Sequence, residues 1–240
     1  MEHDRIKIFK QIKFLKFNQR KNQERKQVMK QTSQEEVWKT KFGVEYNNRN
    51  VFDNNALDEV YISDINISRT AMNEKFIGDM DREIRILEVG CNIGLQLTNL
   101  QEMGFKNLYG IELQPHAVEL AKQRTKEMNI IQATAYDIPF KDNYFDMVFT
   151  SRVLIHMNPN EIHKAIKEIV RCSSDYIYGN EYYADELTEI KNYHGQNNIA
   201  WKRNFPQLYL DLFPELKLLK EEKYKYTFND DLDTTYLFKK

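Results

Sequence analysis

The feature that most constrains the fold is a glycine-containing turn with the sequence EVGCNIG at residues 88–94. It follows a short apolar segment at 84–89 and opens an amphipathic segment at 94–103. The glycines of this turn let the backbone bend sharply and approach a ligand closely, because no Cβ intervenes. Strand, glycine turn and helix in this order predict an α/β unit with a ligand at the turn. The dinucleotide pattern has a third glycine, but Asn92 sits between the two here, so the turn alone does not identify the ligand.

Alternating strands and helices continue to the end of the chain. Apolar strands are expected at 84–89, 108–113, 130–136, 145–150 and 176–183, with two closing strands at 216–228 and 234–238. Helices are expected at 94–103, 115–128 and 160–172. Strands that alternate with helices pair in parallel through right-handed crossovers. The sequence therefore predicts a doubly wound, Rossmann-like α/β fold with a seven-stranded, mostly parallel sheet.

Basic residues are concentrated in an N-terminal extension at 1–30, which has ten Lys or Arg against three Asp or Glu. Residues 31–240 are expected to form one domain. Its parts are N-terminal helices at 31–80, a cofactor-binding core at 84–183, a substrate-side insertion with a helix at 184–215, and closing strands at 216–240. Two or three helices are expected over 32–78, and the first begins at Thr32 or Ser33 because acidic residues follow in the next turn.

Composition excludes several classes of protein. The chain has 35 basic and 36 acidic residues, a balance that argues against a nucleic-acid-binding field over the whole surface. Cys91 and Cys172 form neither a disulfide framework nor a metal-ligand cluster, so no metal is expected. No apolar run approaches the roughly 20 residues of a membrane span. Since the N-terminal segment also lacks the apolar stretch of a signal peptide, a cytoplasmic protein is expected.

Two acidic residues stand at the ends of the first two strands. Glu112 closes the second strand, where a carboxylate is placed to accept hydrogen bonds from both hydroxyls of a ribose. Glu88 closes the first strand and has two interpretations, as a cofactor contact or as a tie for the glycine turn. The carboxyl ends of parallel strands meet at one edge of the sheet, so both carboxylates are expected near the turn.

Four segments together resemble class I S-adenosylmethionine methyltransferases. They are EVGCNIG at 88–94, GIEL at 110–113, AYDIPF at 135–140 and DNYFDMVFT at 142–150. The resemblance implies S-adenosylmethionine as cofactor, S-adenosylhomocysteine as product, and an antiparallel strand pair over 216–239. It also implies a cofactor site with Gly90, Asn92, Gly94 and Ser151 at the methionine part, Glu112 at the ribose, and Asp137 and the backbone of Ile138 at the adenine. Glu88 and Leu113 are the other predicted cofactor contacts.

A closer resemblance covers the chain from about residue 34 to its end. The segments EVW at 36–38, VLIHMNP at 153–159, YHG at 193–195 and WKRNF at 201–205 resemble the pseudaminic acid biosynthesis-associated methylases. This family implies a methyl transfer connected with surface-sugar biosynthesis. The acceptor would then be a small polar molecule, a sugar or a sugar nucleotide, methylated on oxygen or nitrogen.

Further candidate residues lie outside these segments. Tyr46 and Arg49 are three residues apart on a predicted helix, hence on one face, and the Arg fork would bind the cofactor carboxylate; the alternative is a pair on the helix surface. His156 and His194 are candidate catalytic bases, because a neutral imidazole can take a proton near neutral pH. Structural histidines are the alternative for both.

The insertion after the fifth strand has the composition of a sugar-binding surface. Six of its residues are candidate substrate contacts: Glu181, Tyr182, Tyr183, Tyr193, Lys202 and Arg203. Aromatic rings and mixed charges suit a hydroxylated, anionic or neutral ligand. The alternative is a packed lid that makes no contact with the substrate.

Two other functions remain open from the sequence. One is methylation of nucleic acid or protein through the basic extension at 1–30. The fourth strand is followed by TSRV at 150–153, not by an Asn-Pro-Pro-Tyr-type tetrad for a flipped base, which disfavours nucleic acid. The other is a non-catalytic binding module on the same fold. A second copy of this chain is a further candidate partner, through the basic extension.

Overall fold

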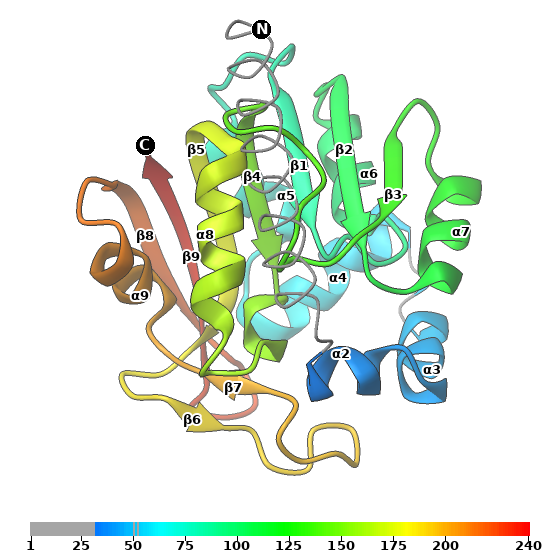
Figure 1. Cartoon of the computed structure of the whole chain (residues 1–240), viewed down its shortest axis with the longest axis vertical. Coiled ribbons are helices and arrows are strands. Elements are labelled where there is room, and N and C mark those ends of the chain that lie inside the picture. Colours follow the sequence, from blue (N-terminus) through cyan, green and yellow to red (C-terminus); the bar gives the residue numbers. More distant parts are fainter. Residues whose placement is uncertain (1–31, 50, 52) are drawn as a thin grey trace, which may run out of the picture.

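The computed structural model describes residues 32–49, 51 and 53–240, so the basic extension at 1–30 lies outside the described residues. The strands of its main sheet are β1 (Arg85–Val89), β2 (Asn107–Glu112), β3 (Asn129–Gln132), β4 (Phe145–Ser151), β5 (Ser173–Tyr183), β8 (Lys217–Lys225) and β9 (Leu232–Lys239). Their order is β3-β2-β1-β4-β5-β9-β8. The first five strands are parallel, and β9 runs antiparallel between β5 and β8 (Figure 1). The predicted fold class is confirmed.

Within residues 32–84, as far as the structure describes them, four short helices precede β1, where two or three were predicted over 32–78. They are α2 (Ser33–Trp38), α3 (Lys41–Arg49), α4 (Asn54–Ile65) and α5 (Arg69–Ile77). Thr32, Asp53 and Ser68 each accept a backbone N–H three residues on, and such an N-cap stabilises a helix by about 1 kcal/mol. Three separate caps therefore divide the segment into separate helices, and the predicted start at Thr32 or Ser33 is confirmed.

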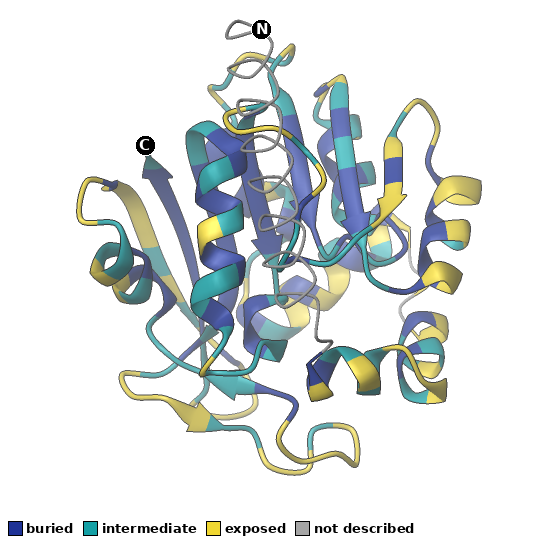
Figure 2. Cartoon of the chain, in the orientation of Figure 1, coloured by how far each residue is buried: buried dark blue, intermediate teal, exposed yellow. Residues whose placement is uncertain are grey.

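Helices cover both faces of the sheet. The crossover helices are α6 (Leu95–Glu102), α7 (Pro115–Arg124) and α8 (Ile162–Cys172), and α9 (Phe205–Leu212) precedes the closing strands. Side chains of α8 and α9 pack in one apolar cluster and those of α4 to α7 in a second, with the sheet between them (Figure 2).

The strands alternate between the two clusters. On β1, Ile86 belongs to the cluster under α4 to α7, and Leu87 to the cluster under α8. On β4, Met147 and Val148 divide in the same way. Burial of one such side chain stabilises the fold by about 1.5–3 kcal/mol. Because both faces are buried, these strands read in the sequence as continuous apolar runs.

The structure differs from the sequence prediction in two places. β3 ends at Gln132, four residues before the predicted end, so residues 133–136 form a loop at the edge of the sheet. The insertion after β5 also contains a small two-stranded sheet, β6 (Thr188–Glu189) with β7 (Trp201–Lys202), that was not predicted. Strands of two residues give no periodic signal in a sequence. None of the described helices is long and apolar enough to cross a membrane.

Candidate active site

The carboxyl ends of β1, β2 and β4 open into one pocket, which encloses about 850 Å³ including its mouth. Helices α2 and α3 and the β6–β7 segment lie at this edge of the sheet (Figure 1). The pocket is lined by Thr32, Gln34, Glu35, Trp38, Tyr46, Asn47, Gly90, Asn92, Glu112, Leu113, Gln114, Ala133, Thr134, Ala135, Tyr136, Ser151, Arg152, Val153, His156 and Met157. Seven of the predicted site residues are therefore in it: Tyr46, Gly90, Asn92, Glu112, Leu113, Ser151 and His156.

Glu112 is fixed at the centre of the pocket by its neighbours' backbones. One carboxylate oxygen accepts the N–H of Asn92 at 3.0 Å, and the other accepts the N–H of Gln114 at 2.9 Å. Burial raises the pKa of Glu112, and these two N–H groups oppose the rise. Each carboxylate oxygen has two lone-pair sites, so both oxygens remain able to accept a hydrogen bond from a ligand.

The glycine turn brings the backbone close to the pocket at Gly90. Its φ is +74°, a left-handed conformation, and a Cβ there would lie 2.7 Å from the side chain of Val153. Asn92 is also left-handed, with φ +48°, a conformation that Asn adopts more readily than most residues. Gly94 does not line the pocket, contrary to the prediction. It caps α6 and approaches Thr125 instead, so its role is in helix packing.

Glu88 lies beneath the turn and does not line the pocket. It is 2% exposed, and one of its carboxylate oxygens has no partner among the described residues. Burial raises the pKa of Glu88 to about 8; the guanidinium of Arg69 lowers it and Glu112 raises it further. The side chain is therefore positioned behind the cofactor turn, which agrees with the structural interpretation of this residue.

The two predicted adenine contacts, Asp137 and Ile138, do not line the pocket. The backbone N–H of Asp137 donates to Thr134, so the chain turns away after the pocket and Asp137 is not part of the lining. The N–H of Ile138 donates to the Glu168 carboxylate at 2.8 Å, so it is not available to a ligand. Residues 133–136 line the pocket in their place, because β3 ends earlier than predicted.

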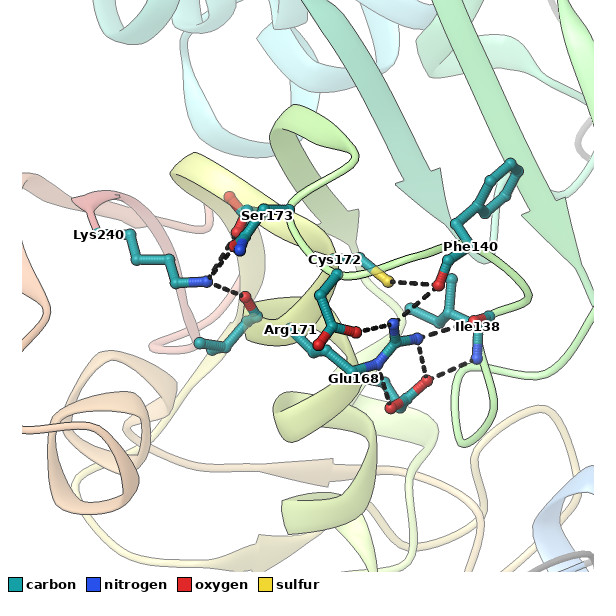
Figure 3. Close-up of polar contacts among 10 residues, drawn as sticks. Ile138, Phe140, Glu168, Arg171, Cys172, Ser173 and Lys240 are labelled. Carbon is teal, nitrogen blue, oxygen red and sulfur yellow. Dashed lines mark hydrogen bonds and ion pairs between the residues drawn. The ribbon is translucent and has the colours of Figure 1, made fainter. Parts of the chain in front are cut away.

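A cluster of polar contacts on α8 holds this loop (Figure 3). The guanidinium of Arg171 donates to both oxygens of Glu168 at 2.7 and 2.8 Å, and to the carbonyls of Ile138 and Phe140. Bidentate bonds of this kind fix geometry as well as contributing energy. The loop after residue 136 is therefore anchored to α8, and the stretch that faces the pocket is the part before it.

Aromatic rings cover the pocket in a group that we call the cap, residues 32–49, 152–157 and 183–203. The ring of Trp38 lies 5.0 Å from Tyr46 and 4.6 Å from His156, and His156 lies 5.2 Å from Tyr193. These edge-to-face distances are the range in which rings attract each other. These packed rings form an aromatic wall on the cap side of the pocket.

Side-chain hydrogen bonds tie the cap to the strand ends at two points. Asn47 donates to Gln114 at 2.8 Å, directly beside Glu112. Glu35 accepts from Thr134 at 2.5 Å, at the loop after β3. Within the cap, the Gln34 side chain donates to the carbonyl of Asn198 at 3.0 Å. The cap therefore contacts the strand ends through polar side chains rather than through a continuous apolar surface.

The two candidate histidines differ in position. His156 lines the pocket, and its Nδ1 donates to the carbonyl oxygen of Ile199 at 3.0 Å, which leaves Nε2 as an acceptor. Burial lowers the pKa of His156 to about 4, so the imidazole is neutral at pH 7. His194 is exposed on the outer side of the cap and does not line the pocket. The structure places only His156 where it can face a ligand.

Arg49 does not reach the pocket. It is exposed at the end of α3, whereas Tyr46, one turn earlier, lines the pocket. Burial raises the pKa of the Tyr46 hydroxyl. The cation that lines the pocket is Arg152, which the sequence analysis did not select.

Glu181 is a structural residue and not a substrate contact. It is 0% exposed, and its carboxylate accepts the N–H groups of Val153, Leu154 and Ile155 at 3.2–3.4 Å. These residues begin the 3-10 turn η1 (Leu154–His156). Burial raises the pKa of Glu181 to about 7. The carboxylate therefore fixes the turn that positions Arg152 and His156.

The other predicted substrate contacts also lie outside the pocket lining. Tyr183 is buried and donates to Asp185 at 2.6 Å. Lys202 pairs with Asp231 at 2.5 Å, because β7 lies beside the hairpin of β8 and β9. Tyr182 stacks on the guanidinium of Arg152.

Arg203 and Tyr193 are the last two of the six predicted substrate contacts. The Nε of Arg203 is buried without a hydrogen-bond partner among the described residues. Tyr193 packs between His156 and His194 in the cap. Of the six predicted residues, only Tyr193 touches the group of rings over the pocket.

The sequence analysis missed several lining residues. Trp38, Gln114, Thr134 and Arg152 all face the pocket. Gln114 and Arg152 each directly follow a strand-end residue that was selected, Leu113 and Ser151, and that adjacency was a usable signal. Trp38 has no such signal, because its place depends on the docking of α2 over the sheet.

The pocket has the features expected of an S-adenosylmethionine site. The Nε1 of Trp38 and the Oδ1 of Asn92 are buried without a partner among the described residues. Buried polar atoms are normally hydrogen-bonded, so both are placed to contact a ligand. Two further features agree with such a site. Glu112 places a carboxylate at the end of β2, and the backbone at Gly90 lines the pocket at a point where a Cβ would collide with Val153. No group of three or more His, Cys, Asp or Glu in the described part of the chain is arranged to hold a metal ion.

Comparison with protein families identifies the central part of the chain. Residues 87–175 match the methyltransferase domain family. This part of the chain is therefore similar to methyltransferase domains, which supports S-adenosylmethionine as the predicted cofactor. The match begins in β1 and ends in β5, so it includes the glycine turn, Glu112, Ser151 and Arg152.

Curated relatives match the same part of the chain. An O-methyltransferase of Aspergillus nomiae is 34% identical over 80 residues, which are 31% of this chain and 36% of the relative. The norajmaline N-methyltransferase of Rauvolfia serpentina is 26% identical over 95 residues, which are 37% of this chain and 32% of the relative. The chain thus aligns with about a third of the length of these relatives.

Solved structures share the fold at low sequence identity. A S-adenosylmethionine-dependent methyltransferase of Methanosarcina mazei has a TM-score of 0.57 at 17% identity, covering 68% of this chain and 95% of that one. The [4+2]-cyclase SpnF also has a TM-score of 0.57, at 15% identity, covering 71% of this chain and 79% of that one. Since a cyclase shares the fold, the fold alone does not fix the reaction.

Proposed function

We propose that this chain is an active S-adenosylmethionine-dependent methyltransferase that methylates a small polar acceptor. The observation that supports this most is Glu112, held by two backbone N–H groups at the centre of a pocket under an aromatic cap. The pocket has a backbone-defined side at the strand ends and a side-chain-defined side at the cap. The first suits an invariant cofactor and the second a variable acceptor.

The strand ends would hold the cofactor. Glu112 would accept the ribose hydroxyls, Gly90 and Ser151 would face the methionine part, and residues 133–136 would surround the adenine. The bound sulfonium supplies an activated methyl group. The protein then has to align the acceptor and exclude water, and alignment alone can account for roughly 7–11 kcal/mol of barrier reduction in favourable systems.

His156 would assist the acceptor nucleophile. Its Nδ1–H is engaged by the Ile199 carbonyl, so Nε2 is the atom that would accept a hydrogen bond from a hydroxyl or amine. A neutral imidazole would hold the nucleophile in place and receive its proton as the bond to the methyl group forms. Such proton transfer typically contributes about 10²–10⁴-fold. His194 is the weaker candidate because it lies outside the pocket.

The acceptor would be a sugar or sugar nucleotide of surface-glycan biosynthesis. Rings of Trp38, Tyr46 and His156 over the pocket suit a ligand with both apolar C–H faces and hydroxyl groups. The resemblance to the pseudaminic acid biosynthesis-associated methylases supports the same class. The relatives include an O-methyltransferase and an N-methyltransferase, so both oxygen and nitrogen are candidate nucleophiles.

Two alternatives have less support. Methylation of nucleic acid or protein through the basic extension concerns residues 1–30, which lie outside the described residues. The other alternative is a non-catalytic module on this fold; a different reaction on the fold is represented among the structural relatives by a cyclase. The intact ribose-type carboxylate at Glu112 favours a functional cofactor site over a vestigial one.

The experiment is an assay of S-adenosylhomocysteine release with S-adenosylmethionine and three sets of acceptors: sugars and sugar nucleotides, RNA, and a protein extract. The expected result is turnover with a member of the first set and none with Glu112→Gln, with Glu119→Gln as the control because Glu119 is exposed on α7. Turnover on RNA alone, falling steeply with salt, would support the alternative instead. No turnover with any set would contradict the proposal.

A further inference from the structure

Arg152 is the single Lys or Arg among the described residues that line the pocket. It follows the last residue of β4, with a left-handed φ of +54°, and its side chain is 22% exposed. The strained backbone directs this side chain across the pocket edge. A buried charge is normally paired or bound to a ligand, so the groups around this guanidinium have to be identified.

Two residues of the β8–β9 hairpin anchor one nitrogen of the guanidinium. Nη2 donates to Asp233 at 2.9 Å and to the Tyr226 hydroxyl at 3.0 Å, and that hydroxyl donates to the other Asp233 oxygen at 3.1 Å. Asp233 is 0% exposed. The closed triangle of bonds fixes the guanidinium and also occupies both protons of Nη2.

The rest of the guanidinium has few protein partners. Its faces lie against two rings, 4.9 Å from the centre of Tyr61 and 5.4 Å from the centre of Tyr182. Its Nε is buried and has no acceptor among the described residues. With Nη2 occupied, Nε and Nη1 carry the remaining N–H donors. Each of these N–H groups can donate a charge-assisted hydrogen bond to an oxygen of a carboxylate or phosphate.

The position of Arg152 across the sheet favours a ligand other than the cofactor. Two strand steps of about 4.8 Å separate Glu112 on β2 from the end of β4. Asp233 on β9 then draws the guanidinium still further from the ribose position. The ribose and adenine positions, at Glu112 and residues 133–136, therefore lie on the opposite side of the pocket from the guanidinium, and only the methionine part, beside Ser151, would approach it.

We propose that Arg152 binds an anionic group, a carboxylate or a phosphate, on the methyl acceptor. The inference rests on the proposed function, because it assigns the acceptor half of the same pocket. Asp233 and Tyr226 are positioning residues, since they hold the guanidinium and do not line the pocket. An acceptor with an acidic group is thus selected over its neutral analogue.

The test measures binding of matched acid and neutral probes to the protein saturated with S-adenosylhomocysteine. The probes are glucuronate with glucuronamide, and glucose 6-phosphate with glucose, titrated by calorimetry. We expect an anionic member to bind more tightly than about 1 mM, at least about 10-fold tighter than its neutral partner. Arg152→Gln should abolish this preference, and Arg152→Lys should retain part of it, because charge remains without the planar fork. The control is Arg85→Gln, an ion-paired arginine at the start of β1.

Three results would overturn the inference. They are equal binding of acid and neutral probes, a preference that persists in Arg152→Gln, and no anionic probe binding below about 1 mM. A fourth separates the two sources of a carboxylate. If Arg152→Gln weakens S-adenosylhomocysteine but not 5′-methylthioadenosine, which lacks the amino-acid part, Arg152 serves the cofactor and the inference is wrong.

Failure of the proposed function is distinguishable from these results. If wild-type protein does not bind S-adenosylhomocysteine, the function fails before the probes are added. If the wild-type protein binds S-adenosylhomocysteine but does not bind the anionic probes, only the inference fails. Should Arg152→Gln not fold, the wild-type comparison of each acid with its neutral partner still decides the matter.

Discussion

Glu112 and His156 face one pocket, yet two different kinds of structure hold them. We call the strand ends at 88–94, 110–114 and 150–151 the floor, in contrast to the cap. Glu112 on the floor is fixed by backbone N–H groups within 20 residues of it in the chain. His156 is fixed by Ile199 and by the rings of Trp38 and Tyr193, which come from distant segments. The floor is a local property of the sequence, and the cap is a property of the assembled fold.

This difference has a chemical consequence. A floor of backbone groups tolerates changes of side chain and suits a ligand that never changes, such as a cofactor. A cap of side chains that meet across long loops can change its acceptor by a few substitutions while the floor stays intact. Breaking the floor should therefore abolish cofactor binding, whereas breaking the cap should spare it.

The largest effect is expected at the joint between the two regions. Glu181→Ala leaves three buried N–H groups without their acceptor and should lower the free energy of unfolding by about 3 kcal/mol. Glu181→Gln keeps the size and one acceptor oxygen and should lose about half as much. Urea denaturation measures both. Unchanged stability in Glu181→Ala, with acceptor binding impaired, would restore the predicted role of Glu181 in substrate binding.

Glu112→Gln tests the floor alone. It removes the negative charge and replaces one acceptor oxygen by a donor, and should weaken S-adenosylhomocysteine about 100-fold, or about 2.7 kcal/mol. The measurement is calorimetric titration, with Glu119→Gln as the matched control on the exposed face of α7. A loss of less than about threefold would mean that Glu112 is not the ribose contact.

His156 gives the cap a signature in the pH dependence of stability. Its pKa falls from 6.5 to about 4 on folding, so the unfolded chain binds a proton that the folded one does not. Stability from this group is therefore complete above pH 6.5 and is lost as pH falls towards 4. We expect about 2 kcal/mol, after allowance for the partial exposure of the ring.

The measurement is the free energy of unfolding at pH 7, 5 and 4 for wild type and His156→Gln. Glu88 and Glu181 change with pH in the opposite direction, because their pKa values are raised to about 8 and about 7. Their contribution cancels in the difference between the two proteins. The exposed His116→Gln is the control. If the free energy of unfolding changes equally from pH 7 to pH 4 in wild type and His156→Gln, the buried, neutral state of His156 is contradicted.

The smallest effects are expected at residues that border the pocket without contacting the cofactor's polar groups. Binding of S-adenosylhomocysteine should change the fluorescence of Trp38 but not that of Trp201, which lies outside the pocket lining. Trp38→Phe should remove the change and Trp201→Phe should keep it. Arg49→Ala should alter the affinity by less than about threefold, because this side chain is exposed. A larger loss would reinstate Arg49 as the carboxylate contact.

The same division decides how much the sequence could predict. The mostly parallel sheet with its antiparallel closing pair, and the positions of Gly90, Asn92, Glu112 and Ser151, were predicted from strand–helix alternation, from the residue types at strand ends and from the family resemblance. The adenine loop was misplaced by a few residues, because the end of β3 is set by packing and not by a local signal. Strand ends are the least certain part of such predictions, and Asp137 and Ile138 failed for that reason.

The cap was predictable only in part. Tyr46 and His156 were selected from their neighbourhood, but Lys202 and Tyr183 turn to partners on other elements, and such partners are invisible in a single sequence. Arg152 was missed because its significance depends on Asp233, far along the chain. Glu181 is a residue type that commonly contacts ligands, yet its carboxylate accepts three backbone N–H groups and so holds the turn η1.

Calorimetric titration of S-adenosylmethionine and S-adenosylhomocysteine into the wild-type protein tests the central claim most directly. The prediction is one site for each compound, with a dissociation constant of about 1–100 μM, lost in Glu112→Gln and kept in Glu119→Gln. No detectable binding of either compound to a folded wild-type protein would contradict the assignment of this pocket as a methyl-donor site.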